Sequence, residues 1–484
     1  MYCFIFYKMS AKTPLKDITH RNKKIKVMLI IAPWDMWESE NVSMYPNGLC
    51  SLASVLEKNN YEVDLLDLTF SKWENIKENI KKKILEMEPD IMGISILSNS
   101  RVSALRLTTF VKEINPKIKI IAGGVHTTCL YEQVLNNYPI DFAVIGEGEL
   151  TILELLKAIN GKKPLNFFKK IKGIAFKHGG KIIKTEPRER IKDLDSLPFQ
   201  KHEFFRKVIE KNNFVQIMSS RGCPFSCSFC PSSVHWGRCM IQRSAENVFK
   251  ELKYVLNKFP KVNRVLFLDD EFICDNQRVI NLCKMIIDDK LDITWHCLGR
   301  VSSINEELIS WMKRAGCREI LFGIESGSQR ILDNIGKKVR IEQIINSVEL
   351  CKKYQINIGY LTIIGLPGEN SASVNESIRL AKKLRVISEP AILIVYPGTE
   401  VYRLAKEKGL LTDEYWLSEG LCPLYTAEHS KLRLGWWSFK TGLISHLYAD
   451  NGDVFDFLNR KIIKKISDIH NFKRVFGRYV SNKI

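Results

Sequence analysis

The stretch that decides the fold is FVQIMSSRGCPFSCSFC, residues 214–230. Its opening segment, Phe214–Met218, is mostly apolar and predicts a buried strand. Directly after this strand come Cys223, Cys227 and Cys230, with the spacing C-x3-C-x2-C. In β/α folds the chemistry lies on the loops at the carboxyl ends of the strands. The stretch therefore predicts a parallel β/α architecture with a site built on thiols.

Three thiolates within eight residues can hold one face of a metal cluster, because soft sulfur ligands suit iron–sulfur and zinc centres. A cubane cluster has four irons, so three cysteines leave one iron open, as a catalytic metal centre requires. The alternative is a zinc site with His235 or Cys239 as the fourth ligand. Zinc sites usually pair two C-x2-C units, or one unit with histidines, and neither pattern is present. The spacing favours a [4Fe–4S] cluster.

Strand-like and helix-like segments alternate from residue 214 to about 395. Six repeats of this kind predict a (β/α)6 partial TIM barrel. The expected strands are Phe214–Met218, Val265–Leu268, Ile293–His296, Glu319–Phe322, Ile358–Ile364 and Ala391–Val395. The expected helices include Ala245–Asn257, Asn276–Asp288, Glu306–Ala315 and Ile341–Tyr354.

Residues 25–160 alternate in the same way and predict a doubly wound parallel sheet covered on both faces. The connector 161–210 is richer in Lys, Gly and Pro, and it contains a hairpin at 173–185 around Gly179-Gly180. The α/β chain is thus divided into a first domain (25–160), a connector (161–210), a core (211–400) and a small mixed or helical C-terminal region (401–484). The expected strands of the first domain are Lys26–Ala32, Glu62–Leu66, Ile91–Ile96, Ile118–Ala122 and Asp141–Ile145. Its expected helices include Gly48–Asn59, Val102–Ile114 and Tyr131–Asn136.

Composition is that of a globular protein without a transmembrane segment, since no apolar run approaches the roughly 20 residues that span a bilayer. The opening MYCFIFYKMS does not match a signal peptide, and Met9 is a plausible second start. Thirteen cysteines without a disulfide-like framework predict reduced thiols in a cytoplasm. The net charge of +19 is compatible with nucleic acid, but no nucleic-acid motif accompanies it, so none is expected as a partner.

The cysteine motif, including the aromatic Phe229 before its last cysteine, resembles that of the radical S-adenosylmethionine (SAM) superfamily. The resemblance implies that SAM binds the open iron and is cleaved reductively to a 5′-deoxyadenosyl radical. Three later segments resemble SAM-contacting motifs of this superfamily: Phe267–Glu271, Gly323–Gly327 and Gly365–Glu369. Arg300 is a candidate to pair with the SAM carboxylate through a charge-assisted bond, with a surface arginine at a strand end as the alternative. The residues assigned to SAM are Phe229, Asp269, Asp270, Arg300, Gly323, Glu325, Ser326 and Gly365.

The first domain resembles the cobalamin-binding domain that precedes many radical SAM barrels. The segments that match are Tyr45–Leu49, Gly123–His126 and Ile145–Glu149, where glycine turns after strands let a ligand approach the backbone. An ordinary doubly wound domain with tight turns is the alternative. The motif D-x-H-x-x-G is absent, since Asp35–Glu40 contains no histidine, so we expect no histidine ligand on cobalt. The residues assigned to cobalamin are Pro46, Gly48, Ser95, Gly123, Gly124, His126, Gly146, Glu147 and Gly148.

The resemblance implies a cobalamin-dependent radical SAM methyltransferase acting on an unactivated carbon, with an electron donor such as flavodoxin or ferredoxin. A cyclase or oxidase similar to the anaerobic magnesium-protoporphyrin monomethyl ester cyclase is the first alternative. A metal-cluster protein that binds nucleic acid is a distant one. The substrate is expected to be a small or lipid-like molecule, and the catalytic residues are not identified. The aromatic residues Trp416, Tyr425, Trp436 and Trp437 fit either a buried core or contact with a large apolar substrate. The basic helical stretch Val454–Ile466 is either a solvated face or a candidate for membrane contact.

Overall fold

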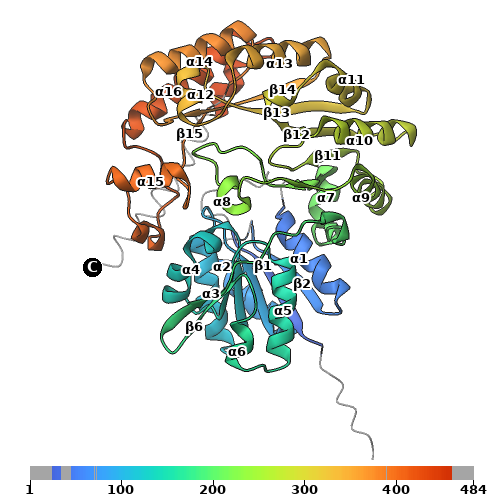
Figure 1. Ribbon diagram of the computed structural model, residues 1–484, viewed down its shortest axis with the longest axis vertical. Helices are drawn as coiled ribbons and strands as arrows, with labels where there is room; N and C mark the ends of the chain where they lie inside the picture. Colours follow the sequence, from blue (N-terminus) through green and yellow to red (C-terminus); the bar gives the residue numbers. More distant parts are fainter. Residues whose placement is uncertain (1–23, 34–44, 70, 72, 389, 461–484) are drawn as a thin grey trace, which may run out of the picture.

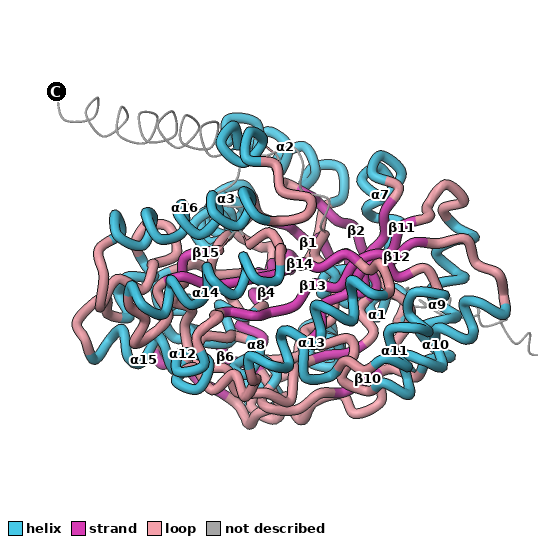
Figure 2. The backbone as a smooth tube through the Cα atoms, turned by 90° about the horizontal axis from the view of Figure 1, so that it is seen from above, coloured by secondary structure: helices cyan, strands magenta, loops and turns pink. Residues whose placement is uncertain are grey.

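The computed structural model describes residues 24–33, 45–69, 71, 73–388 and 390–460. Two helix-flanked sheets lie one above the other in Figure 1, with the short helix α8 (Ser232–Trp236) between them. In the perpendicular view of Figure 2, strands occupy the centre and helices surround them. The predicted α/β class, a doubly wound sheet followed by a partial barrel, is confirmed.

The first sheet has the order β2-β1-β3-β4-β5-β6-β7, and its first five strands are parallel. Because alternate residues of a strand point to opposite faces, the apolar run of β1 contributes to two cores. Val27 and Leu29 pack with α1 and α5, whereas Met28 and Ile30 pack with α2 and α3. The strands are β1 Lys26–Ile31, β2 Glu62–Asp67, β3 Ile91–Ser95, β4 Lys119–Gly123 and β5 Phe142–Val144. The helices are α1 Asn47–Lys58, α2 Trp73–Met87, α3 Arg101–Ile114, α4 Val125–Asn137, α5 Glu149–Asn160 and α6 Leu165–Phe168.

The hairpin predicted around Gly179-Gly180 is present as β6 (Ile174–His178) and β7 (Lys181–Lys184). Both glycines have positive φ, as a tight hairpin turn requires. The hairpin pairs antiparallel with β5, so part of the expected connector extends the first sheet. The rest of the connector crosses to the second sheet through two 3-10 turns and the short helix α7 (Arg206–Asn212).

The second sheet has the order β8-β11-β12-β13-β14-β15, and every neighbouring pair is parallel. Its apolar outer face packs against α9, α10, α11 and α13 in the same continuous core as one face of the first sheet. The strands are β8 Phe214–Ile217, β11 Arg264–Phe267, β12 Thr294–Gly299, β13 Cys317–Glu325, β14 Asn357–Ile364 and β15 Ala391–Ile392. The helices are α9 Ala245–Lys258, α10 Asn276–Asp288, α11 Glu306–Arg314, α12 Gln329–Asn334, α13 Ile341–Lys353 and α14 Ser371–Leu384. A two-stranded ladder, β9 (Ser220–Arg221) with β10 (Ile241–Gln242), follows β8.

The C-terminal region closes one side of the assembly with α15 (Glu400–Glu407) and α16 (Lys431–Tyr448). Trp436 and Trp437, which the sequence left unassigned, lie in α16, which packs on α14, and Trp437 is buried whereas Trp436 is exposed. Residues 454–460 are helical, as predicted for Val454–Ile466, and the rest of that stretch lies outside the described residues. The segment Asp35–Glu40 and the two candidate start methionines, Met1 and Met9, also lie outside them.

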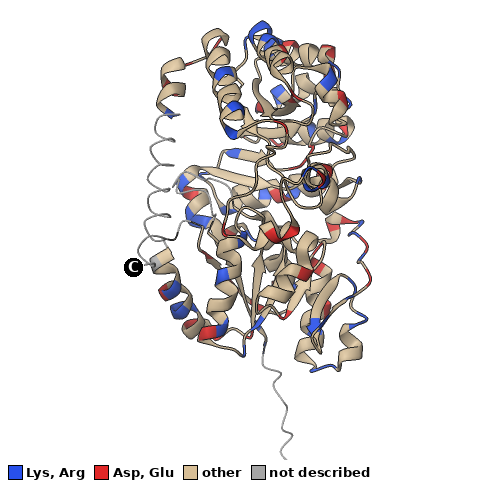
Figure 3. Cartoon of the chain, turned by 90° about the vertical axis from the view of Figure 1, so that its left-hand side faces the viewer, with Lys and Arg blue, Asp and Glu red and all other residues tan. Residues whose placement is uncertain are grey.

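Over the described part of the chain, no helix combines the length and apolarity needed to cross a bilayer. On the face seen in Figure 3, Lys and Arg are interspersed with Asp and Glu over both halves of the molecule.

Candidate functional site

The three motif cysteines lie on the loop between β9 and α8, at the carboxyl edge of the second sheet. Cys227 is buried, and Cys223 and Cys230 are half-buried. Burial raises the pKa of Cys223 and of Cys230 to about 11, and the neighbouring thiol of the trio raises it further in each case. Cys230 therefore interacts electrostatically with each of the other two thiols, and an electropositive group is needed to hold the trio as thiolates.

The cysteine loop is held in place from both sides by backbone contacts. The N–H of Ser228 donates to the carbonyl of Ile335 at 3.0 Å, and that of Val401 in α15 donates to the carbonyl of Ser228 at 3.2 Å. Gly222 has φ +89°, and a Cβ there would lie 2.3 Å from the carbonyl oxygen of Cys239. A side chain is thus excluded immediately before Cys223.

A buried ion pair lies beside this loop. Lys337 Nζ is 2.8 Å from Glu325 Oε1, and both side chains are almost fully enclosed. Glu325 has φ +65°, a conformation that non-glycine residues adopt only when the surroundings impose it. Gly323 leaves the room for the pair, since a Cβ there would lie 2.5 Å from Glu325 Oε1. The positive charge of Lys337 lowers the pKa of Cys230, which places the ammonium near the thiols.

A second pair of charged groups, Arg300 and Glu271, leaves hydrogen-bonding atoms unused. Both side chains are buried, yet neither Arg300 Nη2 nor Glu271 Oε1 has a partner. The Arg300 guanidinium stacks 3.7 Å from the ring of Phe225, within the cysteine loop. Burial raises the pKa of Glu271 to about 7. The two unused atoms have the chemistry to bind a carboxylate and an amine, respectively.

Asp269 and Asp270 lie at the carboxyl end of β11 but differ in their surroundings. Both carboxylate oxygens of the buried Asp269 are engaged by Ser219 and Ser220, at 2.5–2.8 Å. Asp270 is exposed and accepts a hydrogen bond from Ser232 Oγ at 2.7 Å. Asp269 thus holds the segment that precedes the cysteines. The carboxylate with a free oxygen belongs to Glu271, which was not among the residues expected to bind SAM.

The remaining expected SAM residues surround the same edge of the sheet. Ser326 is buried and lies 3.3 Å from Ser377 Oγ. Gly365 has φ +89° and donates its N–H to Glu369 Oε2 at 2.6 Å, which closes the turn after β14. Phe229 is half-buried and packs against the C-terminal cluster around Trp416.

In the first domain, the expected cobalamin residues gather at the carboxyl ends of the strands, which face the cysteine loop (Figure 1). Ser95 and Gly123 end neighbouring strands, β3 and β4. Gly124 begins α4 with φ +92°, and a Cβ there would lie 2.6 Å from the Ile96 carbonyl. Pro46 precedes α1, and Gly48 in its first turn has open space around it. Two positions, Gly48 and Gly146, thus leave room for a ligand near the backbone.

His126 is fully buried and is covered by the C-terminal region. Its Nδ1 lies 3.1 Å from Ser98 Oγ, its ring packs edge-on at 5.6 Å against Trp416, and its Nε2 has no partner. Burial, aided by Arg101, lowers the pKa of His126 to about 3, so the ring is neutral. Arg101 stacks on Trp416 and donates to the carbonyls of Trp416, Ser418 and Gly420, joining α3 to the C-terminal region.

The loop after β5 reaches across to the cysteine loop. Glu147 Oε1 accepts from Arg221 Nη1 at 2.7 Å, and Glu149 Oε1 accepts from Arg221 Nη2 at 2.6 Å. Ser51 of α1 donates to the same oxygen of Glu149 at 2.7 Å. Burial alone would raise the pKa of Glu149, but the Arg221 charge and its hydrogen bonds hold that pKa below the ordinary value. Gly146 and Gly148 flank Glu147 and leave this loop free of other side chains.

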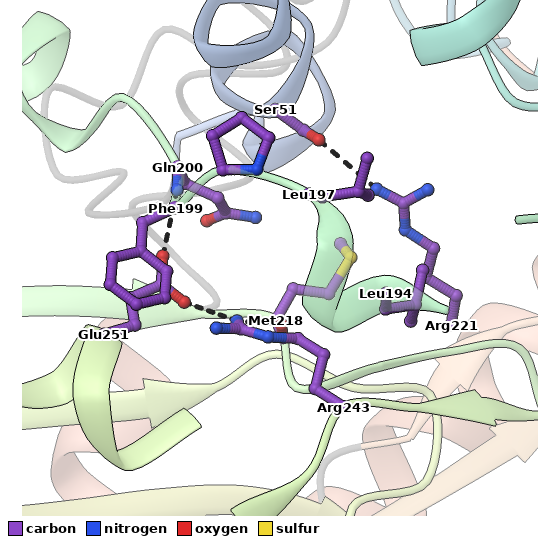
Figure 4. Close-up of a pocket in the computed structure, with 10 residues that line it drawn as sticks. Ser51, Leu194, Leu197, Phe199, Gln200, Met218, Arg221, Arg243 and Glu251 are labelled. Atoms are coloured by element: carbon purple, nitrogen blue, oxygen red, sulfur yellow. Dashed lines mark hydrogen bonds and ion pairs between the residues drawn. The ribbon is translucent and has the colours of Figure 1, made fainter. Parts of the chain in front are cut away.

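A further buried chain of polar groups runs alongside. Tyr45 OH lies 3.0 Å from His202 Nδ1, His202 Nε2 lies 3.2 Å from Glu251 Oε1, and Arg243 pairs with Glu251. Figure 4 shows the cavity at this junction, with Arg221 and Arg243 on either side of Met218. Its volume is about 30 Å³, roughly that of one water molecule. This cavity is therefore too small for a substrate or cofactor.

Two family models match the chain: the radical SAM superfamily over residues 217–381 and the B12 binding domain over residues 40–156. An uncharacterized methyltransferase of Pyrococcus horikoshii is 32% identical over 93% of this chain and 96% of its own length. The chain belongs to the cobalamin-binding radical SAM family. It is an enzyme whose cofactors are SAM, a [4Fe–4S] cluster and cobalamin.

Other relatives of this radical SAM enzyme share less of its length. The anaerobic magnesium-protoporphyrin IX monomethyl ester cyclase of Rubrivivax gelatinosus is 30% identical over 70% of this chain, which spans 62% of the cyclase. The methyltransferase TsrM of Kitasatospora setae, solved with cobalamin and a [4Fe–4S] cluster, superposes with a TM-score of 0.66 at 19% identity, over 80% of this chain and 78% of TsrM. The cobalamin-dependent enzyme OxsB superposes with a TM-score of 0.65 at 20% identity, over 92% of this chain and 62% of OxsB. At these identities the two structures show a common fold.

The side chains present fit the cofactors of the family. Arg300 and Glu271 offer unused buried atoms of opposite charge, which match the carboxylate and amine of SAM. Cys230 interacts electrostatically with the other two motif thiols and with Lys337. The described residues contain no group of three or more His, Cys, Asp or Glu set up for a single metal ion. Sequence reasoning missed Lys337 and Arg221 because neither lies in a cysteine or glycine motif, and only the fold reveals their partners.

Proposed function

We propose that this radical SAM enzyme methylates an unactivated carbon atom of a small-molecule substrate. The observation that carries the proposal is the arrangement of the two domains, whose carboxyl strand ends face one another and are joined by Arg221. A radical formed at one edge and a methyl group carried at the other can then reach the same carbon. The nearly full-length relative described as a methyltransferase supports the same reaction.

Each group of residues has a proposed role. Cys223, Cys227 and Cys230 hold the cluster. Arg300 and Glu271 bind the carboxylate and amine of SAM, and the pair Glu325 and Lys337 orients SAM. When bound, the cluster and SAM supply the hydrogen-abstracting radical, and cobalamin supplies the methyl group. The cobalamin contacts are proposed at Pro46, Gly48, Ser95, Gly123, Gly124, Gly146, Glu147 and Gly148.

The chain itself excludes water from this chemistry. Arg101 and Trp416 draw the C-terminal region over the first domain, and the contact of Val401 with Ser228 draws it over the cysteine loop. A radical that abstracts hydrogen needs such shielding from competing reactions.

We propose that residues 25–160, 161–210 and 211–400 form the cobalamin domain, connector and radical SAM core, and that residues 401–484 help to select the substrate. An electron donor such as flavodoxin or ferredoxin and a reducing compartment such as the cytoplasm complete this proposal.

The first test is anaerobic purification and reconstitution with iron, sulfide and hydroxocobalamin, followed by metal analysis. We expect about four irons and one cobalt per chain. The protein is then incubated with a reductant, an extract of small molecules and SAM carrying a deuterated methyl group. A product that gains the labelled methyl supports the proposal. 5′-Deoxyadenosine with an unlabelled, cyclised or oxidised product would instead favour the reaction class of the cyclase relatives.

A further inference from the structure

One face of the helix α16 packs into the core, and the opposite face is partly exposed among the residues that the structure describes. The buried face packs against α14 and the end of the second sheet. It is largely made of small or polar side chains, together with two larger apolar ones. Its members are Leu434, Trp437, Ser438, Thr441, Gly442, Ser445 and His446.

The opposite face carries a stripe with the spacing i, i+4, i+7, i+11 and i+15, which keeps its members on one side of a helix. Leu432, Trp436 and Leu447 are 87%, 60% and 58% exposed. The stripe consists of Leu432, Trp436, Phe439, Leu443 and Leu447, of which Phe439 and Leu443 are half-buried and Phe439 packs against Phe457. The outward face of α16 is thus more apolar than the face in the core, the reverse of the usual pattern for a surface helix.

The exposed apolar residues of the described chain concentrate here. Twelve large hydrophobic side chains are exposed, and five of them lie between residues 432 and 455. Tyr448 and Phe455, 46% and 77% exposed, continue the apolar surface beyond the stripe. Scattered exposed hydrophobic residues are normal, whereas a contiguous patch marks an interaction surface.

The charge around the stripe identifies the partner. α16 contains Lys431, Arg433 and Lys440 and no acidic residue. Lys382 of α14 lies 3.8 Å over the ring of Tyr448. Asp450, just beyond the helix, is paired with Lys352 and Arg385. Among the described residues after the helix, Asp453 and Asp456 are also acidic, and Asp456 pairs with Arg460.

We propose that α16 docks on an anionic membrane surface, with its stripe in the boundary between headgroups and acyl chains. Leu and Trp on one face with Lys and Arg beside them form the composition that binds this boundary. Eighteen residues give a helix of about 27 Å, which can lie in the membrane plane. A two-fold contact with a second copy would instead oppose two basic helices, and their like charges would repel. The proposal is independent of the reaction that the enzyme catalyses.

Flotation of the full-length holoenzyme with lipid vesicles tests this proposal. We expect it to float with phosphatidylcholine vesicles containing about a third phosphatidylglycerol, and at least about tenfold less with pure phosphatidylcholine. The triple variant Leu432→Ser, Trp436→Ser, Leu447→Ser should bind the anionic vesicles at least about tenfold more weakly. The matched control is Leu85→Ser on α2, a leucine that is 67% exposed but lies outside the stripe, and it should bind like wild type.

A second measurement reports whether the stripe enters the bilayer. Lipids with brominated acyl chains quench tryptophan only at the depth of the chains, so wild-type fluorescence should fall and Trp436→Phe should remove most of that fall. Equal binding of the wild type and the triple variant would overturn the proposal. So would an absence of binding to anionic vesicles, or a dimer in solution that the triple variant dissociates.

Discussion

Arg221 Nη2 lies 2.6 Å from Glu149 Oε1, so a buried ion pair joins the segment that precedes Cys223 to the start of α5 in the cobalamin domain. The other guanidinium nitrogen binds Glu147, and Arg190 holds the backbone carbonyl of Arg221 at 3.0 Å. Each carboxylate would be costly to bury alone, and the bidentate arginine compensates for both. Arg221 therefore makes one of the buried contacts that, together with the hydrogen bond between Tyr45 and Gln216, fix the two cofactor domains relative to each other.

The first prediction concerns that contact. Arg221→Gln leaves Glu147 and Glu149 buried without a cation, so we expect the free energy of unfolding to fall by about 3 kcal/mol. We also expect cobalamin to bind equally well with and without the cluster, whereas in the wild type each cofactor should strengthen binding of the other. Hydroxocobalamin titrations of cluster-loaded and cluster-free protein measure this. The control is Arg188→Gln, which removes the ion pair with the half-exposed Glu154 and should leave the coupling between the two cofactors unchanged. Identical behaviour of the two variants would contradict the role of Arg221 in this coupling.

The cysteine loop yields a second prediction. Alanine at Cys223, Cys227 or Cys230 should abolish the brown chromophore of the reconstituted protein and reduce iron to near zero, because two thiols cannot retain a cubane cluster. His235→Ala and Cys239→Ala, which remove the candidate fourth ligands of a zinc site, should retain full iron. Metal analysis of the five variants checks this. Stoichiometric zinc, lost in either control variant, would support the structural zinc alternative.

Lys337 provides a third prediction. Lys337→Met leaves Glu325 unpaired in a buried position next to the cluster loop, so we expect SAM affinity to fall by at least about tenfold. Equilibrium dialysis of radiolabelled SAM against cluster-loaded protein measures the effect, and the electron paramagnetic resonance of the reduced cluster with SAM should change as well. The neighbouring, exposed Lys338 offers a matched control. An unchanged affinity in Lys337→Met would remove Glu325 and Lys337 from the proposed SAM site.

A fourth prediction follows from the position of His126 under Trp416. Because Trp416 covers the ring, we expect His126→Ala to leave the absorption spectrum of bound cobalamin unchanged. Burial lowers the pKa of His126 from 6.5 to about 3, so the folded state favours the neutral ring. Its contribution to stability is therefore present above pH 6.5 and is lost as the pH falls toward 3. A histidine-ligated cobalamin spectrum in the wild type, abolished in His126→Ala, would refute the prediction.

The fifth prediction uses Glu369, whose pKa is raised by burial from 4.5 to about 7. A raised carboxyl pKa means that the folded protein binds the proton more tightly than the unfolded chain, so stability decreases from pH 4.5 to 7. Glu369→Gln keeps an oxygen for the N–H of Gly365 and removes the charge. We expect it to stabilise the protein at pH 8 by up to about 3 kcal/mol and to have little effect at pH 4.5. Thermal unfolding of both proteins at the two pH values checks this, and equal shifts at both would contradict it.

Local patterns were sufficient for most of the fold. The continuous apolar runs of β1, β3 and β4 indicated a sheet buried on both faces, and the cysteine spacing after β8 located the reactive edge of the second sheet. α16 was not predicted, because apolar residues on both of its faces hide the 3.6-residue period that identifies a helix. The place of the hairpin β6–β7 also escaped prediction, since strand pairing at a sheet edge depends on the partner strand rather than on the hairpin itself.

By itself, the sequence determined the two α/β units, their order and the loop with three thiols, because periodicity and ligand spacing are local properties of a chain. Only the tertiary structure decided which charges meet. Lys337 comes twelve residues after Glu325, and Arg221 comes 72 residues after Glu149. Their pairing depends on how the strands and domains pack, and burial, which makes such pairs energetically important, exists only in the folded protein.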